Sequence, residues 1–481
     1  MPSLEELRKV RLEKLQRLRQ AGVDPYPAHT DRSHTIAAVR AGFAEFESGK
    51  VKLTIAGRIR SVREHGEICF ADLEDGTGKL QLLLNPETLR QPTVKDFVDL
   101  FDIGDFAEAT GTAITTKTGE LTLATSEVRL LTKSLRPLPE KWHGLTDIEE
   151  RLRRRYLDLV VNANERELFR KKAKFWQATR EFLLQKGFLE VETPVLEQVP
   201  GGADAEPFVT HLNALDIDLY LRISPELHLK RLIVGGYEKV FEIGRIFRNE
   251  GMDREHLQDY TQMEFYWAYA DYEDLRKFVQ EMYQYVIKET LGTLKATYQN
   301  QEIDWSGNWS EVEFYDLFNE NFGFRPGEPR KVVQEALIKY GLDPDSPKGW
   351  DLLYKKVIRP KLIQPRFLVR PPVEMEPLAK RDPNDSRRVL RLQVVAAGTE
   401  LGKGFSELND PDDQRKRFQD QMALREAGDK EAQMLDEDFL EALEYGMPPT
   451  AGFGFSERLF AVLMDKSVRE AVLFPLMKPR E

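Results

Sequence analysis

The chain has 481 residues, of which 41% are hydrophobic and 31% charged, with a formal net charge of −11. Its length exceeds what one hydrophobic core usually supports, so we expect two or three domains. The negative charge argues against a protein that coats nucleic acid without specificity, because such binding relies on clustered Lys and Arg side chains. A local basic face for a specific RNA is compatible with it.

Apolar runs and cysteine content bear on where the protein works. The longest apolar runs, such as Leu459–Met464, are far shorter than the ~20 residues that a membrane helix requires. The N-terminal residues carry charges at helical spacing and lack the apolar core of a signal peptide. Cys69 is the only cysteine, so no disulfide can form within the chain. We therefore expect no membrane span and a cytoplasmic location.

The first 133 residues divide into a helical segment and a run of strands. Residues 1–50 form the helical segment, in which Ser3 and Glu6 fit a capping box opening a helix to Gly22, and a second helical pattern covers residues 36–46. Residues 51–133 contain five short runs rich in Ile, Val, Leu and Thr, separated by turn signals. This pattern predicts a small barrel, most economically an OB-fold, which commonly binds single-stranded nucleic acid.

A linker over residues 134–155 contains Pro137 and Pro139 and ends in the arginine-rich run 151–155, which opens a long helical stretch to about Lys186. These arginines are expected either to contact RNA or to form a solvated helix face. Residues 156–481 alternate strand-like and helical patterns, with a mostly helical insertion at about 311–362. The chain is therefore expected to belong to the α+β class.

Two glycine-rich segments look only superficially like nucleotide-binding signatures. Gly398–Lys403 is one residue too short between its glycines for a P-loop, and Gly404 stands where Ser or Thr should bind magnesium. The segment Gly452–Gly454 lacks the third glycine of a dinucleotide fingerprint. Neither a P-loop nor a Rossmann site is expected.

Three separated blocks carry the strongest pattern: Phe188–Val195, Phe247–Phe265 and Gly452–Leu459. In order, they resemble motifs 1, 2 and 3 of the class II aminoacyl-tRNA synthetases. The resemblance implies a catalytic domain over residues 156–481, built as an antiparallel sheet flanked by helices, behind an OB-fold β-barrel that binds the anticodon. Motif 1 builds the dimer interface in this family, so a homodimer is expected.

Motif 2 suits the activation of an amino acid by ATP. The attacking carboxylate and the α-phosphate repel each other, and Arg248 could bridge them because a guanidinium has a fixed fork of donors. We expect Arg248 and Arg458 to be catalytic through charge stabilisation and positioning, without proton transfer. The resemblance implies that Glu250 reads the adenine, that His256 approaches the distal phosphates and that Tyr260 and Arg458 cover the two faces of the ring. The implied ATP-binding set is Arg248, Glu250, His256, Tyr260, Glu400 and Arg458.

The resemblance also implies Mg²⁺ as the cofactor, since this ion takes one or two carboxylates besides phosphate oxygens. Glu400 aligns with one ligand of the family. Gln393 stands where the lysine enzymes usually carry a second Glu, and its amide oxygen can bind the ion without bringing charge. The expected metal ligands are therefore Glu400 and Gln393.

Beyond the motifs, the resemblance narrows to the bacterial-type lysyl-tRNA synthetases across nearly the whole chain. Supporting segments include Leu221–Arg231, Ala268–Tyr272, Gly404–Asp410 and Pro448–Ala451. It implies that Glu226 and Glu264 face the α-amino group of lysine, while Glu407 and Tyr266 hold its ε-ammonium. The implied lysine-binding set is Gly202, Glu226, Arg248, Glu264, Tyr266, Phe405 and Glu407. A pocket for aspartate would need a cation in place of Glu407.

Several positions around this site depart from the family pattern. Lys403 stands where Asn is usual, close to the substrate carboxylate, and Leu257 replaces an Asn of motif 2. Motif 3 is one residue shorter than usual. Two interpretations stay open: a divergent lineage that compensates internally, and a partial loss of activity.

In the N-terminal barrel, the resemblance aligns Phe70, Gln81 and Glu120 with positions that read the anticodon bases. Stacking on an aromatic ring and hydrogen bonds to base edges suit recognition of single-stranded RNA. The alternative for Phe70 is a core aromatic. Phosphate contacts could come from three arginines of the first strand and its turn: Arg58, Arg60 and Arg63.

The sequence thus predicts ATP-dependent activation of L-lysine to lysyl-adenylate and transfer of lysine to the 3′ end of tRNA(Lys). Two alternatives stand beside it: a ligase of the same subclass for another amino acid, and a non-catalytic relative that binds RNA through its barrel. The expected partners are ATP, L-lysine, tRNA(Lys) and a second copy of the chain.

Overall fold

A computed structural model describes residues 3–139, 145–251, 253, 255–346 and 348–480. The chain divides into two compact units, Met1–Thr146 and Asp147–Glu481. Residues 140–144 of the expected linker, and Met252 and Arg254 of motif 2, lie outside the described residues.

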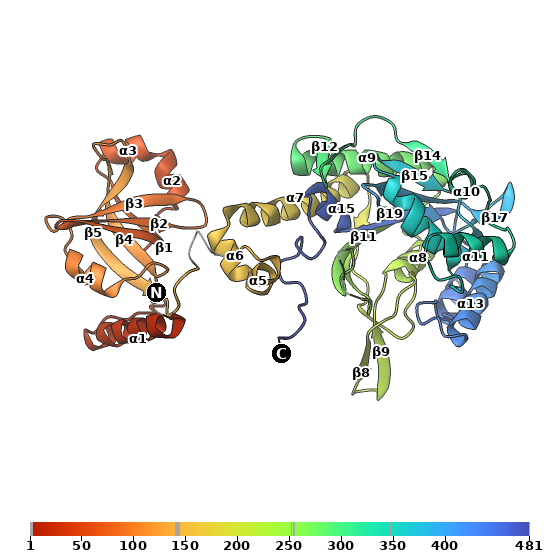
Figure 1. The fold of residues 1–481 in the computed structure, drawn as a ribbon, viewed down its shortest axis with the longest axis horizontal. Coiled ribbons are helices and arrows are strands. Elements are labelled where there is room, and N and C mark those ends of the chain that lie inside the picture. The colour runs from red at the N-terminus through yellow and green to blue at the C-terminus, as the bar shows by residue number, and fades with distance from the viewer. Residues whose placement is uncertain (1–2, 140–144, 252, 254, 347, 481) are drawn as a thin grey trace. The chain divides into compact units, whose positions relative to one another are not determined.

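The first unit is a closed barrel in which the strands follow one another in the order β1-β2-β3-β5-β4 (Figure 1). Alternate side chains of each strand enter the interior, as Leu80, Leu82 and Leu84 do on β3. β3 and β5 pair in parallel, and the other neighbours pair antiparallel. The strands are β1 (Lys52–His65), β2 (Ile68–Glu74), β3 (Lys79–Leu84), β4 (Phe106–Thr115) and β5 (Leu121–Thr132). The predicted OB-fold barrel is confirmed.

Four helices accompany the barrel: α1 (Leu4–Gln20), α2 (Ile36–Ala41), α3 (Phe43–Ser48) and α4 (Val94–Leu100). The capping box predicted at Ser3 and Glu6 opens α1. The second helical pattern is split in two at Gly42, which caps both α2 and α3. α4 closes one end of the barrel interior with Phe97, which is fully buried.

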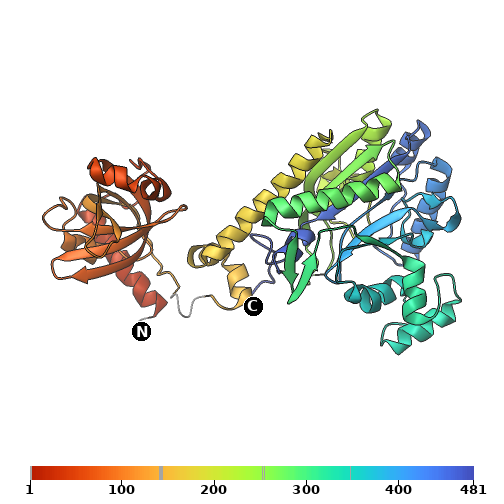
Figure 2. The same ribbon diagram turned by 90° about the horizontal axis from the view of Figure 1, so that it is seen from above.

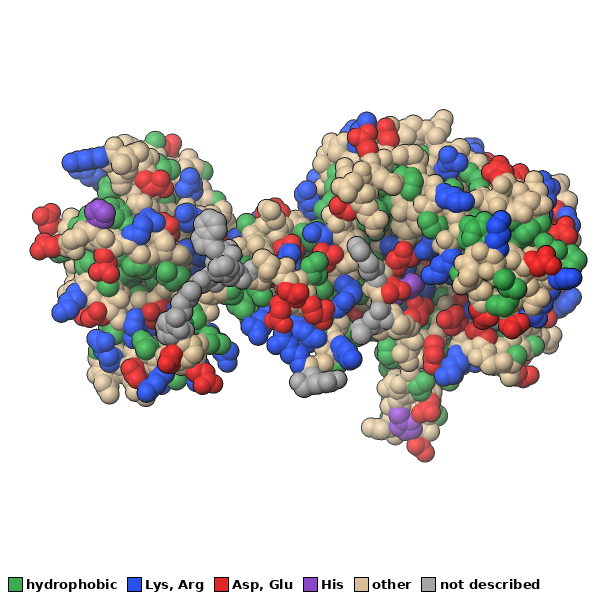
Figure 3. All heavy atoms as spheres, in the orientation of Figure 1, with side chains coloured by type: hydrophobic (Ala, Val, Ile, Leu, Met, Phe, Trp, Pro, Cys, Tyr) green, Lys and Arg blue, Asp and Glu red, His purple; other side chains and the backbone are tan. Residues whose placement is uncertain are grey.

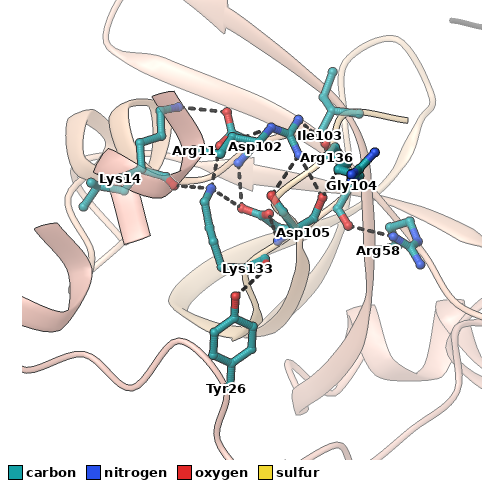
Figure 4. A network of polar contacts seen from close by, with 12 residues as sticks. Arg11, Lys14, Tyr26, Arg58, Asp102, Ile103, Gly104, Asp105, Lys133 and Arg136 are labelled. Atoms are coloured by element: carbon teal, nitrogen blue, oxygen red, sulfur yellow. Dashed lines mark hydrogen bonds and ion pairs between the residues drawn. The ribbon is translucent and has the colours of Figure 1, made fainter. Parts of the chain in front are cut away.

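A network of charged side chains ties α1 to the barrel (Figure 4). Arg11 donates hydrogen bonds to the carbonyl oxygens of Ser134 and Ile103, at 3.0 and 2.9 Å. Lys14 of α1 and the fully buried Lys133 both form ion pairs with Asp102. Polar contacts therefore hold α1 in place together with its few buried leucines.

The second unit is built on an eight-stranded sheet in the order β14-β15-β18-β19-β20-β11-β10-β6. The edge pairs β14-β15 and β10-β6 are parallel, and the inner pairs are antiparallel. The strands are β6 (Leu189–Glu190), β10 (Lys239–Phe247), β11 (Asp259–Ala268), β14 (Ser310–Glu313), β15 (Arg366–Val369), β18 (Arg391–Ala396), β19 (Thr399–Ser406) and β20 (Thr450–Ser456). Together with the barrel, this sheet confirms the α+β prediction.

Helices cover both faces of this sheet. On one face, α7 (Ala163–Gln185), α9 (Tyr272–Leu291) and α15 (Arg458–Leu463) bury an apolar core, and Figure 2 shows α7 and α9 side by side. On the other face, α8 (Glu226–Val234), α13 (Pro411–Glu426) and α14 (Glu437–Glu444) bury a second cluster against β10, β11 and β19. The candidate site lies on this second face.

Smaller elements complete the second unit. The insertion begins with β14 and continues as α10 (Phe314–Phe322), α11 (Arg330–Lys339), α12 (Gly349–Leu353) and two short turns of π and 3₁₀ helix, Tyr354–Ile358 and Arg359–Lys361. β7 (Leu196–Glu197), β8 (Val209–Leu212) and β9 (Ile217–Leu221) form a projecting sheet (Figure 1), while β12 (Lys295–Tyr298), β13 (Gln301–Asp304), β16 (Arg381–Asp382) and β17 (Asp385–Val389) form two hairpins. A 3₁₀ turn covers Val373–Met375. Within the described residues, no helix has the length and apolar content to cross a membrane.

The arginine-rich run opens a helical stretch that reaches Gln185, as predicted, but the stretch is not one continuous helix. The segment forms α5 (Ile148–Arg153), α6 (Arg155–Val161) and α7, because Arg154 and Asn162 adopt non-helical backbone angles. The breaks let Arg155, which is 1% exposed, turn inward to Asp158 and Glu165 at 2.8 and 3.1 Å. Acidic and basic side chains consequently lie together over α5 and α6 (Figure 3). Arg155 is neither an RNA contact nor part of a solvated helix face.

Candidate active site

The polar face of the second unit begins with the alternation of side chains on β11. Met263 and Phe265 enter the apolar core under α7 and α9, so Glu264 and Tyr266 point to the opposite face. Both side chains are nevertheless buried, because α8 and β19 cover them. A carboxylate and a phenol thus lie on the sheet away from bulk water.

Two glycines of β20 form the floor of this region. A Cβ on Gly452 would lie 2.3 Å from Oε1 of Glu407, and a Cβ on Gly454 would lie 2.9 Å from Cγ of Glu264. At Gly452, a larger residue would displace the acidic side chain. The Gly-Phe-Gly segment therefore makes room for carboxylates, in agreement with its exclusion as a dinucleotide fingerprint.

A β-bulge determines which side chains of β19 reach the same face. Gln393 of β18 pairs with Lys403, but after a register shift Val395 pairs with Glu400. Leu401 is the extra residue and is buried in the apolar core. The bulge therefore brings Glu400 to the face that carries Gln393 and Lys403.

Three buried carboxylates, those of Glu226, Glu264 and Glu407, meet in one pocket with exposed fractions of 5%, 4% and 2%. Glu264 accepts hydrogen bonds from Ser224 Oγ at 2.7 Å and Tyr266 Oη at 3.0 Å. Among the described residues, buried Oε1 of Glu407 accepts no hydrogen bond. Burial and the neighbouring Glu226 raise the pKa of Glu264 to about 7, and burial raises the pKa of Glu407 well above its ordinary value. The pocket is therefore suited to a cationic ligand.

Sequence reasoning missed Lys230, which forms ion pairs with two of these carboxylates. Its Nζ lies 2.6 Å from Oε1 of Glu226 and also contacts Oε2 of Glu407. The contact with Glu226 follows from i,i+4 spacing on α8 and could have been read from the sequence. The contact with Glu407 joins α8 to the end of β19 and depends on the tertiary fold.

The two expected lining residues lie beside these charges. Gly202 has a φ of +86°, and a Cβ there would lie 2.8 Å from Cβ of Glu226. The ring of Phe405 lies 5.5 Å from Nζ of Lys230. Apart from Arg248, the implied lysine set thus comes from the loop between β7 and β8, from α8, from β11 and from the region of β19.

Arg248 follows β10 and lies at the edge of the pocket. Its backbone N–H donates to the carbonyl oxygen of Gln258 at 2.8 Å, which holds the two sides of the motif 2 loop together. Its guanidinium lies 5.7 Å from the ring centroid of Tyr260, and its Nε donates to the carbonyl of Ile223 at 3.4 Å. Among the described residues, no carboxylate forms an ion pair with Arg248 in this state, so its charge is available to an anionic ligand.

Other described residues of the motif 2 loop contact each other. Gln258 donates to the carbonyl oxygen of Glu250 at 3.2 Å. His256 Nδ1 lies 2.7 Å from Oδ2 of Asp253, and both side chains are partly exposed. The loop thus leaves His256 at the surface, where a ligand can reach it.

Arg458 begins α15 and joins the third motif to the second. It donates to the carbonyl oxygens of Glu255 and Glu400, at 2.9 and 3.4 Å. Burial acts to raise the pKa of Glu400, but Lys355, Arg359, Arg391 and Arg458 together outweigh burial, so the pKa of Glu400 lies below its ordinary value. Within the described part of the chain, buried Nε atoms of Arg359 and Arg458 have no hydrogen-bond acceptor. These donors can serve a polyanionic ligand.

Lys403 forms its ion pair with an acid other than Glu226, Glu264 and Glu407. Its Nζ lies 3.0 Å from Oε2 of Glu376, and Nε of Arg391 lies 3.2 Å from Oε1 of the same carboxylate. Glu376 is buried, so the two cations compensate a charge that would otherwise be unpaired. This departure from the family pattern is compensated within the site.

Leu257, another departure, is 8% exposed and packs in the apolar core of the second unit. An amide at this position would bury polar atoms among apolar side chains. The loop is therefore anchored through hydrophobic contact.

In the barrel of the first unit, Phe70 and Gln81 lie on outward-facing positions of β2 and β3. Their strand neighbours enter the barrel core, and Phe70 is only partly buried and does not belong to that core. Thr122 pairs with Gln81, which places the exposed Glu120 two residues away at the same edge. The core-aromatic alternative for Phe70 was wrong, because the pleat of β2 turns its ring outward.

The three arginines of β1 are already engaged to different degrees. Arg58 lies over the ring of Phe106 at 4.1 Å, and Arg60 forms an ion pair with Glu74 at 3.0 Å. Arg63 is half exposed and forms a longer pair with Asp72. Arg63 is therefore the most accessible of the three for a phosphate.

These features define a class II aminoacyl-tRNA synthetase. The profile described as tRNA synthetases class II (D, K and N) matches residues 147–478, and the one described as OB-fold nucleic acid binding domain matches residues 53–131. The chain is 47% identical to the lysine–tRNA ligase of Pelotomaculum thermopropionicum, over 99% of this chain and 96% of that protein. For the lysine–tRNA ligases of Moorella thermoacetica and Thermotoga maritima, identities are 46% and 44%, over 99% of this chain and 98% and 97% of theirs. The chain belongs to the lysine–tRNA ligase family, and the predicted resemblance is confirmed.

Proposed function

We propose that the chain activates L-lysine with ATP to lysyl-adenylate and transfers lysine to the 3′ end of tRNA(Lys). The observation that carries this proposal is the buried carboxylate of Glu407, whose Oε1 has no hydrogen-bond donor among the described residues. A buried carboxylate oxygen without a donor is costly, and the ε-ammonium of lysine would supply the donor that Oε1 lacks. An aspartate-specific pocket would need a free cation here, whereas Lys230 is already paired with two carboxylates.

The pocket accommodates lysine in one orientation. Glu226 and Glu264 receive the α-amino group, and Glu407 with Tyr266 receives the ε-ammonium. The α-carboxylate then points toward Arg248 at the edge of the pocket. Gly202 and Phe405 enclose the aliphatic chain between the two charged ends.

Arg248 performs the central electrostatic task. An oxygen of the lysine carboxylate attacks the α-phosphorus of ATP, the bond to the β,γ-phosphates breaks, and pyrophosphate leaves. Arg248 bridges carboxylate and α-phosphate and stabilises the charge that gathers between them. In the second step, a 3′-terminal hydroxyl of tRNA attacks the lysyl carbonyl carbon and AMP leaves with the former carboxylate oxygen.

We assign the adenine base and the phosphates of ATP to the parts of the site around Arg248 and Arg458. Tyr260 and Arg458 enclose the adenine ring, Glu250 reads its amino group, and His256 reaches the distal phosphates. The unpaired Nε atoms at Arg359 and Arg458 add donors near Glu400.

The residues expected to hold Mg²⁺ fit an ion that arrives with ATP. Glu400 has a lowered pKa and is ionised, and buried Oε1 of Gln393 has no hydrogen-bond donor among the described residues. No cluster of three or more His, Cys, Asp or Glu that could hold a metal occurs in the described chain. Glu400 and Gln393 would therefore hold Mg²⁺ jointly with phosphate oxygens, and the bound ion would neutralise phosphate charge.

Replacing Gln393 with glutamate is expected to lower the Mg²⁺ concentration that supports half-maximal pyrophosphate exchange by about tenfold, because a second carboxylate strengthens binding. Titration of Mg²⁺ at fixed ATP, with calorimetry of ATP binding, measures the change. Gln177→Glu on the exposed side of α7 is the matched control. An unchanged Mg²⁺ requirement in Gln393→Glu would contradict this assignment.

Lysine-dependent exchange of pyrophosphate with ATP tests the proposed activity directly. Exchange with lysine supports it. Exchange with another amino acid and not with lysine would favour a different ligase of the subclass, and no exchange with any amino acid would favour a non-catalytic RNA-binding protein.

We also propose that Phe70, Gln81 and Glu120 read the anticodon. Phe70→Ala is expected to weaken tRNA(Lys) binding about tenfold, since loss of base stacking costs ~1–3 kcal/mol. Lysine-dependent exchange without tRNA should be unchanged, because the substitution lies in the other unit. Filter binding and exchange assays measure both quantities, and equal tRNA affinity in Phe70→Ala would refute this role.

A homodimer and a cytoplasmic location remain predictions. Motif 1 and the following β7 expose the apolar side chains of Leu189, Val195 and Leu196, which supports an interface at that surface. Sedimentation of the full chain would test the dimer.

A further inference from the structure

Lys230 has an unusual position for a lysine. It is fully buried on α8, one turn after Glu226, and its ammonium group contacts Glu226 and Glu407. The rings of Phe405 and Phe439 lie 5.5 and 5.9 Å from Nζ. The side chain is thus enclosed by the acidic pocket and by aromatic rings and has no access to water.

The ammonium group stays charged in this environment. Burial acts to lower the pKa of Lys230, but Glu226 and Glu407 outweigh burial and raise it above its ordinary value. A buried ammonium without partners would instead lose its proton. Lys230 therefore supplies one positive charge to the pocket at neutral pH.

The charge of Lys230 changes the net charge of the acidic pocket. Glu226, Glu264 and Glu407 supply three negative charges when all are ionised, and Lys230 offsets one of them. Lys403 is outside this count, because it belongs to a neighbouring cluster with Glu376, Arg391 and Asp204 that is neutral when all four groups are ionised. Two negative charges are left, and they equal the charge of the two ammonium groups of one lysine molecule.

We propose that Lys230 is a specificity-determining positioning residue: a resident ammonium that joins Glu226 to Glu407 and leaves the pocket with an excess of two negative charges. This inference rests on the proposed placement of lysine between these carboxylates. Lys230 acts through Glu226 and Glu407 and does not touch the reacting atoms.

Proton release is a consequence for the protein without substrate. The titratable groups that face Glu264 are Glu226, Glu407, Tyr260, Tyr266 and Arg248, and Ser224 and Gln262 donate hydrogen bonds to it. The pKa of Glu264 is raised to about 7 by burial and by Glu226, so the empty pocket holds protons that an entering ammonium must displace. Lysine affinity should therefore rise as pH increases through 7 and level off above it.

Calorimetry on the wild-type protein tests this consequence without any substitution. Titrations of lysine near pH 7, in buffers that differ in ionisation enthalpy, should show release of about one proton or more per lysine bound. No proton release would overturn the charge count.

Lys230→Met keeps the length and apolar stem of the side chain and removes its charge. The KM for lysine is expected to rise about 100-fold, as for loss of one partner of a buried ion pair, while the KM for ATP and kcat change little. Without Lys230, the carboxylates hold their protons more tightly, so the pH at which lysine KM levels off should move upward by about one unit. A purely structural lysine would not shift this pH profile. Lys239→Met, a partly buried lysine of β10 beside Trp267, is the matched control.

A double-mutant cycle keeps the test decisive if Lys230→Met folds poorly. Lys230→Met combined with Glu226→Gln removes one charge of each sign and restores the balance. Its lysine KM should be no higher than that of the worse single variant, and its thermal stability should recover. Strictly multiplicative effects in the cycle would contradict coupling.

Different results would refute the proposed placement of lysine and the proposed role of Lys230. If Glu407→Gln and Glu226→Gln leave lysine KM unchanged, the placement of lysine is wrong. If those variants raise lysine KM but Lys230→Met changes neither KM nor its pH profile, the inference about Lys230 is overturned and the placement stands.

Discussion

Replacing Arg248 with alanine is expected to abolish lysyl-adenylate formation, lowering kcat/KM in pyrophosphate exchange by about 10³-fold or more. Removing a single donor to a transition-state charge costs about 10²–10³ in rate, and Arg248 would serve two anions at once. Because no carboxylate among the described residues pairs with it, its removal should leave little unpaired charge and should cost little stability. Affinity for tRNA(Lys) should be nearly unchanged.

Exchange assays and binding of labelled tRNA measure the two quantities on the same preparation. Arg245→Ala is the matched control, since this arginine of β10 is half exposed and forms a surface pair with Asp259. Loss of tRNA affinity in Arg248→Ala would mean that the functions of the two units have been misassigned. Retained exchange would remove Arg248 from the chemistry.

Glu407→Gln should raise the KM for lysine about 100-fold while leaving the KM for ATP close to its original value. Two opposite unit charges ~4 Å apart gain about 4 kcal/mol at an effective dielectric near 20, before desolvation is subtracted. The amide keeps the shape of the side chain and removes that attraction from a site that is 2% exposed. The substitution also leaves Lys230 with one carboxylate fewer, which adds to the loss.

Kinetics with lysine and with uncharged amino acids of similar length measure this change. Discrimination against the uncharged analogues should fall along with lysine affinity, because these analogues lack the ammonium group that would pair with Glu407. Glu437→Gln, an exposed position on α14 paired with Arg415, serves as the control. A lysine KM unaffected by Glu407→Gln would show that the ε-ammonium binds elsewhere.

The sequence predicted the barrel, the family and the motifs that carry the site, because these follow from local patterns. Alternation on β2 and β11, and motif spacing around Arg248 and Arg458, are encoded in a few neighbouring residues. The ion pair of Lys230 with Glu407 could not be predicted in this way, because it joins α8 to the end of β19. Its partners are distant in the sequence, so only the structure brings them together.

Two further features escaped prediction for physical reasons. The bulge at Leu401 shifts the register by one residue, and the adjacent Gly402 does not by itself distinguish a bulge from a regular strand position. The helix breaks at Arg154 and Asn162 serve buried ion pairs of Arg155, which helical periodicity does not report. Buried ion pairs and a register shift were thus harder to predict from the sequence than the apolar core was.

The cluster of Lys403, Glu376 and Arg391 makes the effect of one substitution depend on its neighbours. Glu376 is held by both cations, so returning Lys403 alone to the usual Asn would leave a buried acid with one partner. Exchanging single residues of this cluster for those of relatives is therefore a poor guide to their individual effects.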